Sequence, residues 1–325
     1  MEDLEIAGST VLITGGAGFI GSHLVKELVK RKAKVVITDL IIHPQSFFAV
    51  ENLKKDTIYK KVDIRDKEQV SHIFKTYTPQ YIFHLAAEPI VATSYDNPYN
   101  TFMTNIIGTV NILDACRYNS KTKAVIVASS DKAYGKTKKP YRETSPLQGD
   151  HPYDVSKSCT DLIAQTYYKT YGLPVIITRF GNVYGEGDIH FDRIIPGLCK
   201  SILKNEVLDI RSDGTYIRDY IYAGDVVLAY ILLLKKYNKI AGEAFNVSAD
   251  VSFTVLTLIK KTERVLKRKV SYKILNTARN EIPYQHLLNK KIKKLGWKAS
   301  FSLEKGLQNT FAWYANNLFK DSTNV

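Results

Sequence analysis

The chain has 325 residues, of which 45% are apolar and 24% are charged. This composition is that of a globular protein and argues against a disordered one. The formal net charge of +14 would suit a nucleic-acid or membrane surface. However, the basic residues are scattered in short pairs such as Lys54-Lys55 and Lys138-Lys139, so we expect solvated faces and neither a nucleic-acid nor a membrane partner.

The three cysteines, Cys116, Cys159 and Cys199, form no CxxC pair and have no histidine cluster beside them. We therefore expect neither a disulfide framework nor a metal site. The longest apolar run, 226–234, is too short to cross a bilayer, and the first nine residues lack the pattern of a signal peptide. These features predict a cytoplasmic protein.

Short β-branched runs alternate with amphipathic stretches through the first half of the chain. This alternation predicts an α/β fold with a Rossmann-type, doubly wound parallel sheet and right-handed crossovers. After Gly181 the alternation ends, and we expect a smaller α/β substrate-binding domain there. The predicted strands are 10–14, 34–39, 80–85, 123–129 and 175–180, and the predicted helices are 21–31, 105–118 and 153–171.

A glycine-rich turn joins the first predicted strand to the first predicted helix. Gly15 permits a positive φ, Gly18 keeps the backbone open to a pyrophosphate, and Gly21 lets the helix pack closely on the strand. The free amides of the helix N-terminus then favour phosphate binding. Asp39, at the end of the next strand, can accept hydrogen bonds from an adenosine ribose and would repel a 2′-phosphate. The sequence therefore predicts NAD as the cofactor.

Two polar clusters follow in the chain. Tyr153 and Lys157 are four residues apart on a predicted helix and share one face. The ammonium there can lower the pKa of the phenol and prepare it to accept a proton. Ser130, Asp131 and Lys132 follow a predicted strand, at the edge where open α/β sheets bind ligands. Ser130 can hydrogen-bond a reacting oxygen, and the other two can form an acid–base pair.

Six segments occur in the order found in the extended short-chain dehydrogenases/reductases, which the chain resembles over essentially its whole length: TGGAGFIG, HLAA, SSDKAYG, PYDVSK, RFGNVYG and RDYIYAGDVV. Within that family of NAD-dependent epimerases and dehydratases, the chain is most similar to the CDP-glucose 4,6-dehydratases. The features that carry this similarity are Asp131-Lys132, the stretch 141–153 and the stretch 281–297.

The resemblance implies conversion of a nucleotide-linked hexose, best matched by CDP-glucose, to a 4-keto-6-deoxy sugar with NAD recycled. Tyr153, with Ser130 and Lys157, would take the proton of the 4-hydroxyl. Lys132 would remove the C5 proton, and Asp131 would protonate the departing 6-hydroxyl. Lys132 needs a lowered pKa for this role, which burial or the nearby Lys157 can provide.

The resemblance also implies the other contacts. The predicted cofactor-binding residues are Gly15, Gly18, Phe19, Ile20, Gly21, Asp39, Asp63, Ile64, Leu85, Ala86, Ala87, Asn105, Tyr153 and Lys157. The predicted substrate-binding residues are Ser130, Asn182, Arg193 and Arg218. Pairing of helices 105–118 and 153–171 with those of a second copy would make a homodimer.

Domain limits follow from the same pattern. We predict an NAD-binding domain over 1–180, to which the chain returns around 222–248, and a substrate-binding domain over 181–221 and 249–325. Two other functions stay open. A nucleotide-sugar 4-epimerase would use Ser130, Tyr153 and Lys157 without an adjacent acid–base pair, and a non-catalytic NAD-binding regulator would need none of these side chains.

Overall fold

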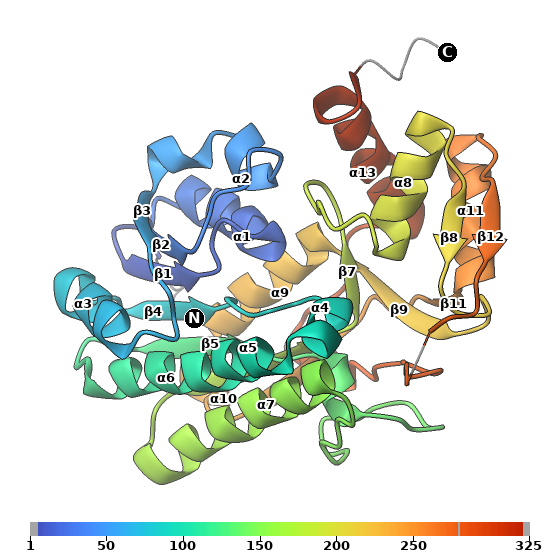
Figure 1. Cartoon of the computed structure of the whole chain (residues 1–325). Helices are drawn as coiled ribbons and strands as arrows, with labels where there is room; N and C mark the ends of the chain where they lie inside the picture. Colours follow the sequence, from blue (N-terminus) through green and yellow to red (C-terminus); the bar gives the residue numbers. More distant parts are fainter. Residues whose placement is uncertain (1–5, 279, 321–325) are drawn as a thin grey trace.

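The computed structural model describes residues 6–278 and 280–320. Its main sheet has seven parallel strands in the order β10-β6-β5-β4-β1-β2-β3 (Figure 1). This order is that of a Rossmann-type sheet and confirms the predicted fold class. The strands are β1 (Thr10–Thr14), β2 (Lys34–Asp39), β3 (Ile58–Lys61), β4 (Tyr81–His84), β5 (Ala124–Ala128), β6 (Val175–Phe180) and β10 (Ala244–Val247).

Helices cover both faces of this sheet, so successive strand side chains enter two different apolar cores. On β1, Val11 and Ile13 pack in one core, and Leu12 packs in the other. The first core is closed by α1 (Phe19–Lys30) and α9 (Ala223–Lys235). The second core is closed by α3 (Lys67–Tyr77), α6 (Gly108–Tyr118) and α7 (Pro152–Tyr171).

Short elements connect these layers along the first half of the chain. The predicted helix 105–118 begins within a π-helical turn that continues into α6. We did not predict β3, because only Ile58 and Tyr59 of its four side chains are partly buried. The connecting elements are α2 (Phe47–Val50), η1 (Leu53–Asp56), α4 (Val91–Asp96), α5 (Pro98–Phe102), η2 (Met103–Ile107) and η3 (Asp131–Tyr134).

The chain after Gly181 builds two small sheets, β11-β9-β7 and β12-β8, and returns to the main sheet through α9 and β10. Figure 1 shows α8, α11 and α13 beside the small sheets, away from α6 and α7. The predicted domains also include 1–5 and 321–325, which lie outside the described residues. The further elements after Gly181 are β7 (Asn182–Tyr184), α8 (Ile194–Lys204), β8 (Leu208–Ile210), β9 (Ile217–Tyr222), α10 (Tyr237–Ile240), β11 (Ser252–Thr254), α11 (Val255–Leu266), β12 (Tyr272–Ile274), α12 (Lys290–Lys294) and α13 (Leu303–Asn317).

No helix within 6–278 and 280–320 is both long and apolar enough to cross a membrane.

A buried polar cluster joins the main sheet to the segment around η3. Arg179 on β6 donates from Nε to Asp161 Oδ2 at 2.7 Å and from Nη2 to Asp161 Oδ1 at 2.8 Å. Its Nη1 donates to the Tyr134 hydroxyl at 2.6 Å and to the Glu143 carbonyl at 3.0 Å. The Tyr134 hydroxyl donates to Asn246 Oδ1 on β10 at 2.6 Å. One guanidinium therefore connects β6, α7, η3 and, through Tyr134, β10.

The Arg179→Met variant tests this connection. It leaves the buried Asp161 carboxylate unpaired, so we expect the free energy of unfolding to fall by about 3–5 kcal/mol. The double variant Arg179→Met/Asp161→Leu removes both charges and should recover a large part of this loss. Urea denaturation followed by circular dichroism measures both values; equal losses in the single and double variants would contradict the pairing argument.

Candidate active site

A cleft of about 950 Å³ lies along the carboxyl ends of the main strands and extends into the second half of the chain. This edge of an open parallel sheet is where ligands bind. The volume is large enough for a cofactor and a substrate side by side. Every predicted site residue lines the cleft except Asn105 and Asp131.

The glycine turn has the shape that its spacing predicts. Gly15 has φ +69°, and a Cβ there would lie 2.7 Å from the Ala86 amide nitrogen. A Cβ on Gly21 would lie 2.1 Å from the Gly15 carbonyl oxygen, whereas one on Gly18 would approach only that oxygen, at 3.2 Å. Helix α1 begins at Phe19 with no side-chain cap, so its first amides are available to an anion at the cleft. The turn therefore fits a pyrophosphate.

Asp39 stands beside this turn at the end of β2. Its Oδ2 accepts from the Ala17 amide at 3.1 Å and its Oδ1 from the Leu40 amide at 2.8 Å. Burial raises the pKa of Asp39, and the hydrogen bonds from backbone amides oppose that rise. The carboxyl group is thus fixed next to the turn, where a ribose diol would meet it.

Asp63 and Ile64 form the neighbouring wall. Arg65 donates from Nε to Asp63 Oδ1 at 2.9 Å, and the hydrogen bond from Arg65 lowers the pKa of Asp63. Arg65 thus holds the Asp63 carboxylate in place. Ile64 supplies the apolar surface of this wall.

Asn105 lies behind the cleft wall. Its Oδ1 accepts from the Glu88 amide at 2.7 Å and its Nδ2 donates to Ser156 Oγ at 2.8 Å. Its side chain therefore fastens the segment after β4 to α7. His84 is also internal, between Thr14 Oγ1 at 2.7 Å and Thr109 Oγ1 at 3.0 Å, and burial lowers its pKa to about 3.

Tyr153 and Lys157 lie in the first two turns of α7, and Ser130 follows β5. Burial raises the pKa of Tyr153, while the hydrogen bond with Ser130 and the charge of Arg193 oppose that rise. The Lys157 Nζ donates to the Ala128 carbonyl at 3.0 Å, and burial lowers its pKa to about 8. The expected lowering of the phenol pKa by Lys157 stays a prediction, since the groups that lower the pKa of Tyr153 here are Ser130 and Arg193.

Asp131 and Lys132 are adjacent but differ in surroundings. Asp131 is 1% exposed, and its Oδ1 accepts from Ser130 Oγ at 3.0 Å. The Lys132 Nζ lies 3.8 Å from that carboxyl oxygen, and 22% of its side chain is exposed. Burial raises the pKa of Asp131, against the charge of Lys132. The acid is thus buried behind the cleft wall, whereas the lysine lines the cleft.

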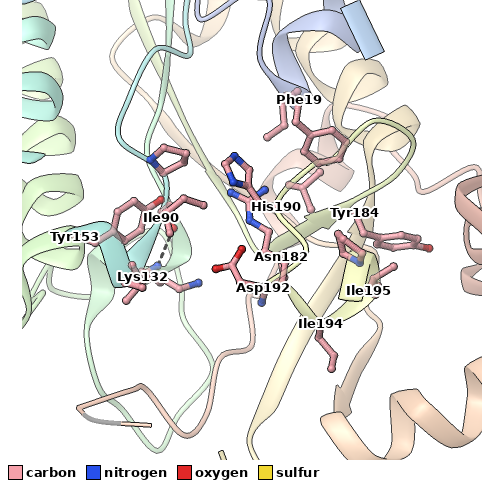
Figure 2. A pocket seen from close by; sticks show the side chains of 18 of the residues that line it. Phe19, Ile90, Lys132, Tyr153, Asn182, Tyr184, His190, Asp192, Ile194 and Ile195 are labelled. Carbon is pink, nitrogen blue, oxygen red and sulfur yellow. Dashed lines mark hydrogen bonds between the residues drawn. The ribbon is translucent and has the colours of Figure 1, made fainter. Parts of the chain in front are cut away.

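The predicted substrate contacts come from the second half of the chain. Asn182 Nδ2, on β7, donates to the Asp219 carbonyl at 3.3 Å. Arg218 on β9 pairs with Glu281 at 3.2 Å, and Arg193, just before α8, pairs with Asp188 at 2.9 Å. Figure 2 shows Asn182 across the cavity from Tyr153 and Lys132. Two guanidinium groups thus face the cleft, where they can bind phosphate oxygens.

Sequence reasoning missed several polar side chains that line the cleft. Most come from loops or short elements after Gly181, where no strand–helix pattern marks the position, whereas Lys200 lies on α8 and His151 stands just before α7. Figure 2 shows two of them, His190 and Asp192, in the loop before α8. The missed polar residues include His151, His190, Asp192, Lys200, Glu206, Asp209, Arg211, Glu281 and Gln285.

The chain matches known proteins over nearly its full length. A model of the family described as GDP-mannose 4,6 dehydratase matches residues 12–310. The dTDP-D-glucose 4,6-dehydratase of Dictyostelium discoideum is 30% identical, over 97% of this chain and 83% of that protein. The dTDP-glucose 4,6-dehydratase of Haemophilus influenzae is 29% identical, over 94% of this chain and 98% of that protein.

Solved structures of both dehydratases and epimerases are similar to it. The UDP-glucose 4-epimerase of Thermotoga maritima, solved with UDP-glucose, has a TM-score of 0.87 and 32% identity, and covers 95% of this chain and 99% of that one. The dTDP-glucose 4,6-dehydratase of Bacillus anthracis, in complex with NAD, has a TM-score of 0.84 and 28% identity, and covers 97% of this chain and 100% of that one. Structural likeness alone therefore does not separate the two reactions.

Replacing Lys157 by methionine should stabilise the protein at neutral pH. Because burial lowers the pKa of Lys157 from 10.5 to about 8, the buried ammonium costs about 3 kcal/mol below pH 8. This cost falls to zero between pH 8 and 10.5, because in this range the folded lysine has lost its proton while the unfolded one still holds it, and removing that proton becomes easier as the pH rises. The lost hydrogen bond to Ala128 offsets about 1 kcal/mol, which leaves a gain of about 2 kcal/mol at pH 7.

Thermal unfolding of both proteins from pH 7 to roughly 9.5 measures this effect. A stability difference that stays constant with pH would contradict the burial argument.

Proposed function

The chain belongs to the family described as GDP-mannose 4,6 dehydratase, within the extended short-chain dehydrogenases/reductases, and we propose that it is an NAD-dependent nucleotide-sugar 4,6-dehydratase that acts on CDP-glucose. The observation that supports this most is the grouping of two sets of side chains at one end of the cleft. Ser130 and Tyr153 suit oxidation of an alcohol, and Lys132 beside Asp131, whose burial raises its pKa, suits loss of water.

The residues that would hold NAD are the turn 15–21 at the pyrophosphate, Asp39 at the adenosine ribose, and Tyr153 and Lys157 at the reacting end. The uncapped N-terminus of α1 and the crowded positions of Gly15 and Gly21 fit such a group. NAD held there would supply the redox chemistry, which is hydride acceptance from C4 of the hexose and hydride return to C6.

The chain's own residues move the protons. Tyr153, hydrogen-bonded to Ser130, accepts the proton of the 4-hydroxyl, and the resulting ketone makes the hydrogen on C5 acidic. Lys132 removes that proton and returns one to C5 when the hydride reaches C6. The bond between C6 and its oxygen breaks, and the oxygen leaves as water with a proton from Asp131. Because Asp131 lies behind the wall, this proton reaches the cleft through the Ser130 hydroxyl, which contacts Asp131 Oδ1.

The state of Asp131 decides whether Lys132 can be a base. A carboxylate beside an amine favours the ammonium, whereas a protonated carboxyl group does not. Burial raises the pKa of Asp131 and so favours the protonated form. Burial thus favours in Asp131 the form that can donate a proton, and this form does not stabilise an ammonium on Lys132.

The carboxylates that line the cleft in the second half of the chain favour cytosine over uracil and thymine. They are Glu206 and Asp209, and Arg211 lines the cleft as well. A carboxylate accepts a hydrogen bond from the amino group that cytosine carries and that uracil and thymine lack. The similarity of 141–153 and 281–297 to CDP-glucose dehydratases agrees with this choice, although the named relatives act on dTDP- or UDP-glucose.

A nucleotide-sugar 4-epimerase is the alternative, and the similarity to the Thermotoga maritima epimerase favours it. Such an enzyme needs Tyr153, Ser130 and Lys157 but has no water to remove. An ionisable pair with the acid buried and the amine in the cleft is then unexplained. The pair therefore favours the dehydratase.

We also propose the division into a cofactor-binding domain, 1–180 with 222–248, and a substrate-binding domain, 181–221 with 249–325. The three cysteines are unpaired, which agrees with a reducing compartment such as the cytoplasm. Exposed large apolar side chains gather on α4 to α7, where a second copy would cover them in a homodimer. They are Tyr95, Tyr99, Ile107, Tyr118, Leu162, Tyr168 and Tyr171.

The test of the function is incubation with CDP-, dTDP-, UDP- and GDP-glucose in deuterated water, followed by mass spectrometry. We expect CDP-glucose to lose one water and gain one deuterium at C5, and Tyr153→Phe to be inactive with all four. If the enzyme prefers another nucleotide, only the proposed cytosine is wrong and the proposed reaction stands. An unchanged mass with inverted C4 would make the protein an epimerase.

Lys132→Met tests the assignment of the C5 base. We expect the variant to oxidise C4, seen as absorbance of the reduced cofactor, but to lose deuterium exchange at C5 by at least about 100-fold. Lys136→Met is the matched control, because its side chain is exposed and pairs with Asp150. Exchange at the normal rate in Lys132→Met would remove Lys132 from this role.

A further inference from the structure

A histidine–aspartate pair flanks Tyr153 and has no role in the steps above. His151 stands just before α7 and Asp154 lies in its first turn, with side chains 3% and 0% exposed. The His151 Nε2 lies 3.0 Å from Asp154 Oδ1, and His151 also lines the cleft. Within the described chain, neither Asp154 oxygen has a hydrogen-bond partner, so the contact is electrostatic rather than an aligned hydrogen bond.

Asp154 has opposite effects on its own helix and on Tyr153. No side chain caps α7, and a carboxylate in the first turn interacts favourably with the free amides there. Burial raises the pKa of Tyr153, and the charges of Asp131 and Asp154 raise it further. Asp154 thus stabilises the start of the helix that carries Tyr153 while opposing the ionisation of its phenol.

We propose that His151 is the charge partner of Asp154, so that the pair presents no net charge to Tyr153. His151 is then a positioning residue that acts through Asp154, and this inference rests on the proposed use of Tyr153 as a base. A buried carboxylate needs such a partner. With the charge of Asp154 balanced, Ser130 and Arg193 are left to favour the phenolate.

The surrounding groups leave this task to His151. The Tyr95 ring lies against the His151 ring, with centroids 5.3 Å apart and a tilt of 31°, but carries no positive charge. In the described part of the chain, no lysine or arginine lies within ion-pair distance of Asp154. The titratable groups that interact with Tyr153 or Asp154 from neighbouring elements are Asp131 on η3, Arg193 before α8, Tyr95 on α4 and Tyr141 after η3, and Lys132 and Lys157 line the same cleft.

The His151→Gln variant separates this role from packing. We expect the midpoint of the pH dependence of kcat to rise by about one unit. Near neutral pH, kcat should fall about tenfold with KM nearly unchanged. The double variant His151→Gln/Asp154→Asn removes the uncompensated charge and should restore the midpoint and most of kcat. Asp150→Asn is the control, because it removes the same charge from an exposed neighbour and should leave the profile unchanged.

Two results would overturn the inference. One is an unchanged pH profile in His151→Gln, and the other is a double variant as slow as the single one. If His151→Gln does not fold, Asp154→Asn alone tests the inference, because removal of the Asp154 charge should not raise the pH midpoint of kcat. A raised midpoint in Asp154→Asn would then contradict the inference. If the wild type converts no nucleotide-hexose, the proposed function fails. Ultraviolet titration of the tyrosinate, with Tyr153→Phe as the reference, then tests the effect of His151 on the Tyr153 phenol without substrate.

Discussion

Arg179 is buried where the sheet, α7 and the turn after β5 meet, and its charge cannot be solvated there. It therefore needs the Asp161 carboxylate on one side and the Tyr134 hydroxyl on the other, and it has both. The hydrogen bonds of this one guanidinium fix the positions of β6, α7 and η3 relative to one another. Those elements carry Tyr153, Lys157, Asp131 and Lys132, so the geometry of the site depends on a pair that never contacts the cleft.

The reacting groups are also buried, and the low dielectric of the protein interior shifts their pKa values. Burial raises the pKa values of Tyr153 and Asp131 and lowers that of Lys157. Each shift disfavours the charged form, which is unhelpful for Tyr153 as a base and helpful for Asp131 as an acid. The groups that oppose the rise for Tyr153 are Ser130 and Arg193, and they come from different halves of the chain. The base thus depends on the substrate side of the cleft as well as on its own helix.

The sequence predicted the sheet well, because both faces are covered and its strands are short apolar runs. Three of its predicted strands, 10–14, 34–39 and 175–180, have the observed limits. It also placed most of the cofactor wall, since the glycine turn is a local structure whose conformation depends on its own residues. It missed Asp192 and Gln285, because the position of a loop side chain depends on packing between distant segments.

Asn105 and Asp131 show a different limit of sequence reasoning. Both were assigned to the cleft surface, and both lie one layer behind it, where they are held by Ser156 and Ser130 respectively. A resemblance predicts where a residue lies along the chain, but it does not predict the direction in which its side chain points. For Asp131 that direction matters chemically. A carboxyl group at the surface of the cleft would be solvated, whereas burial raises the pKa of this one and favours its protonated form, and Lys132 is the one of the two that lines the cleft.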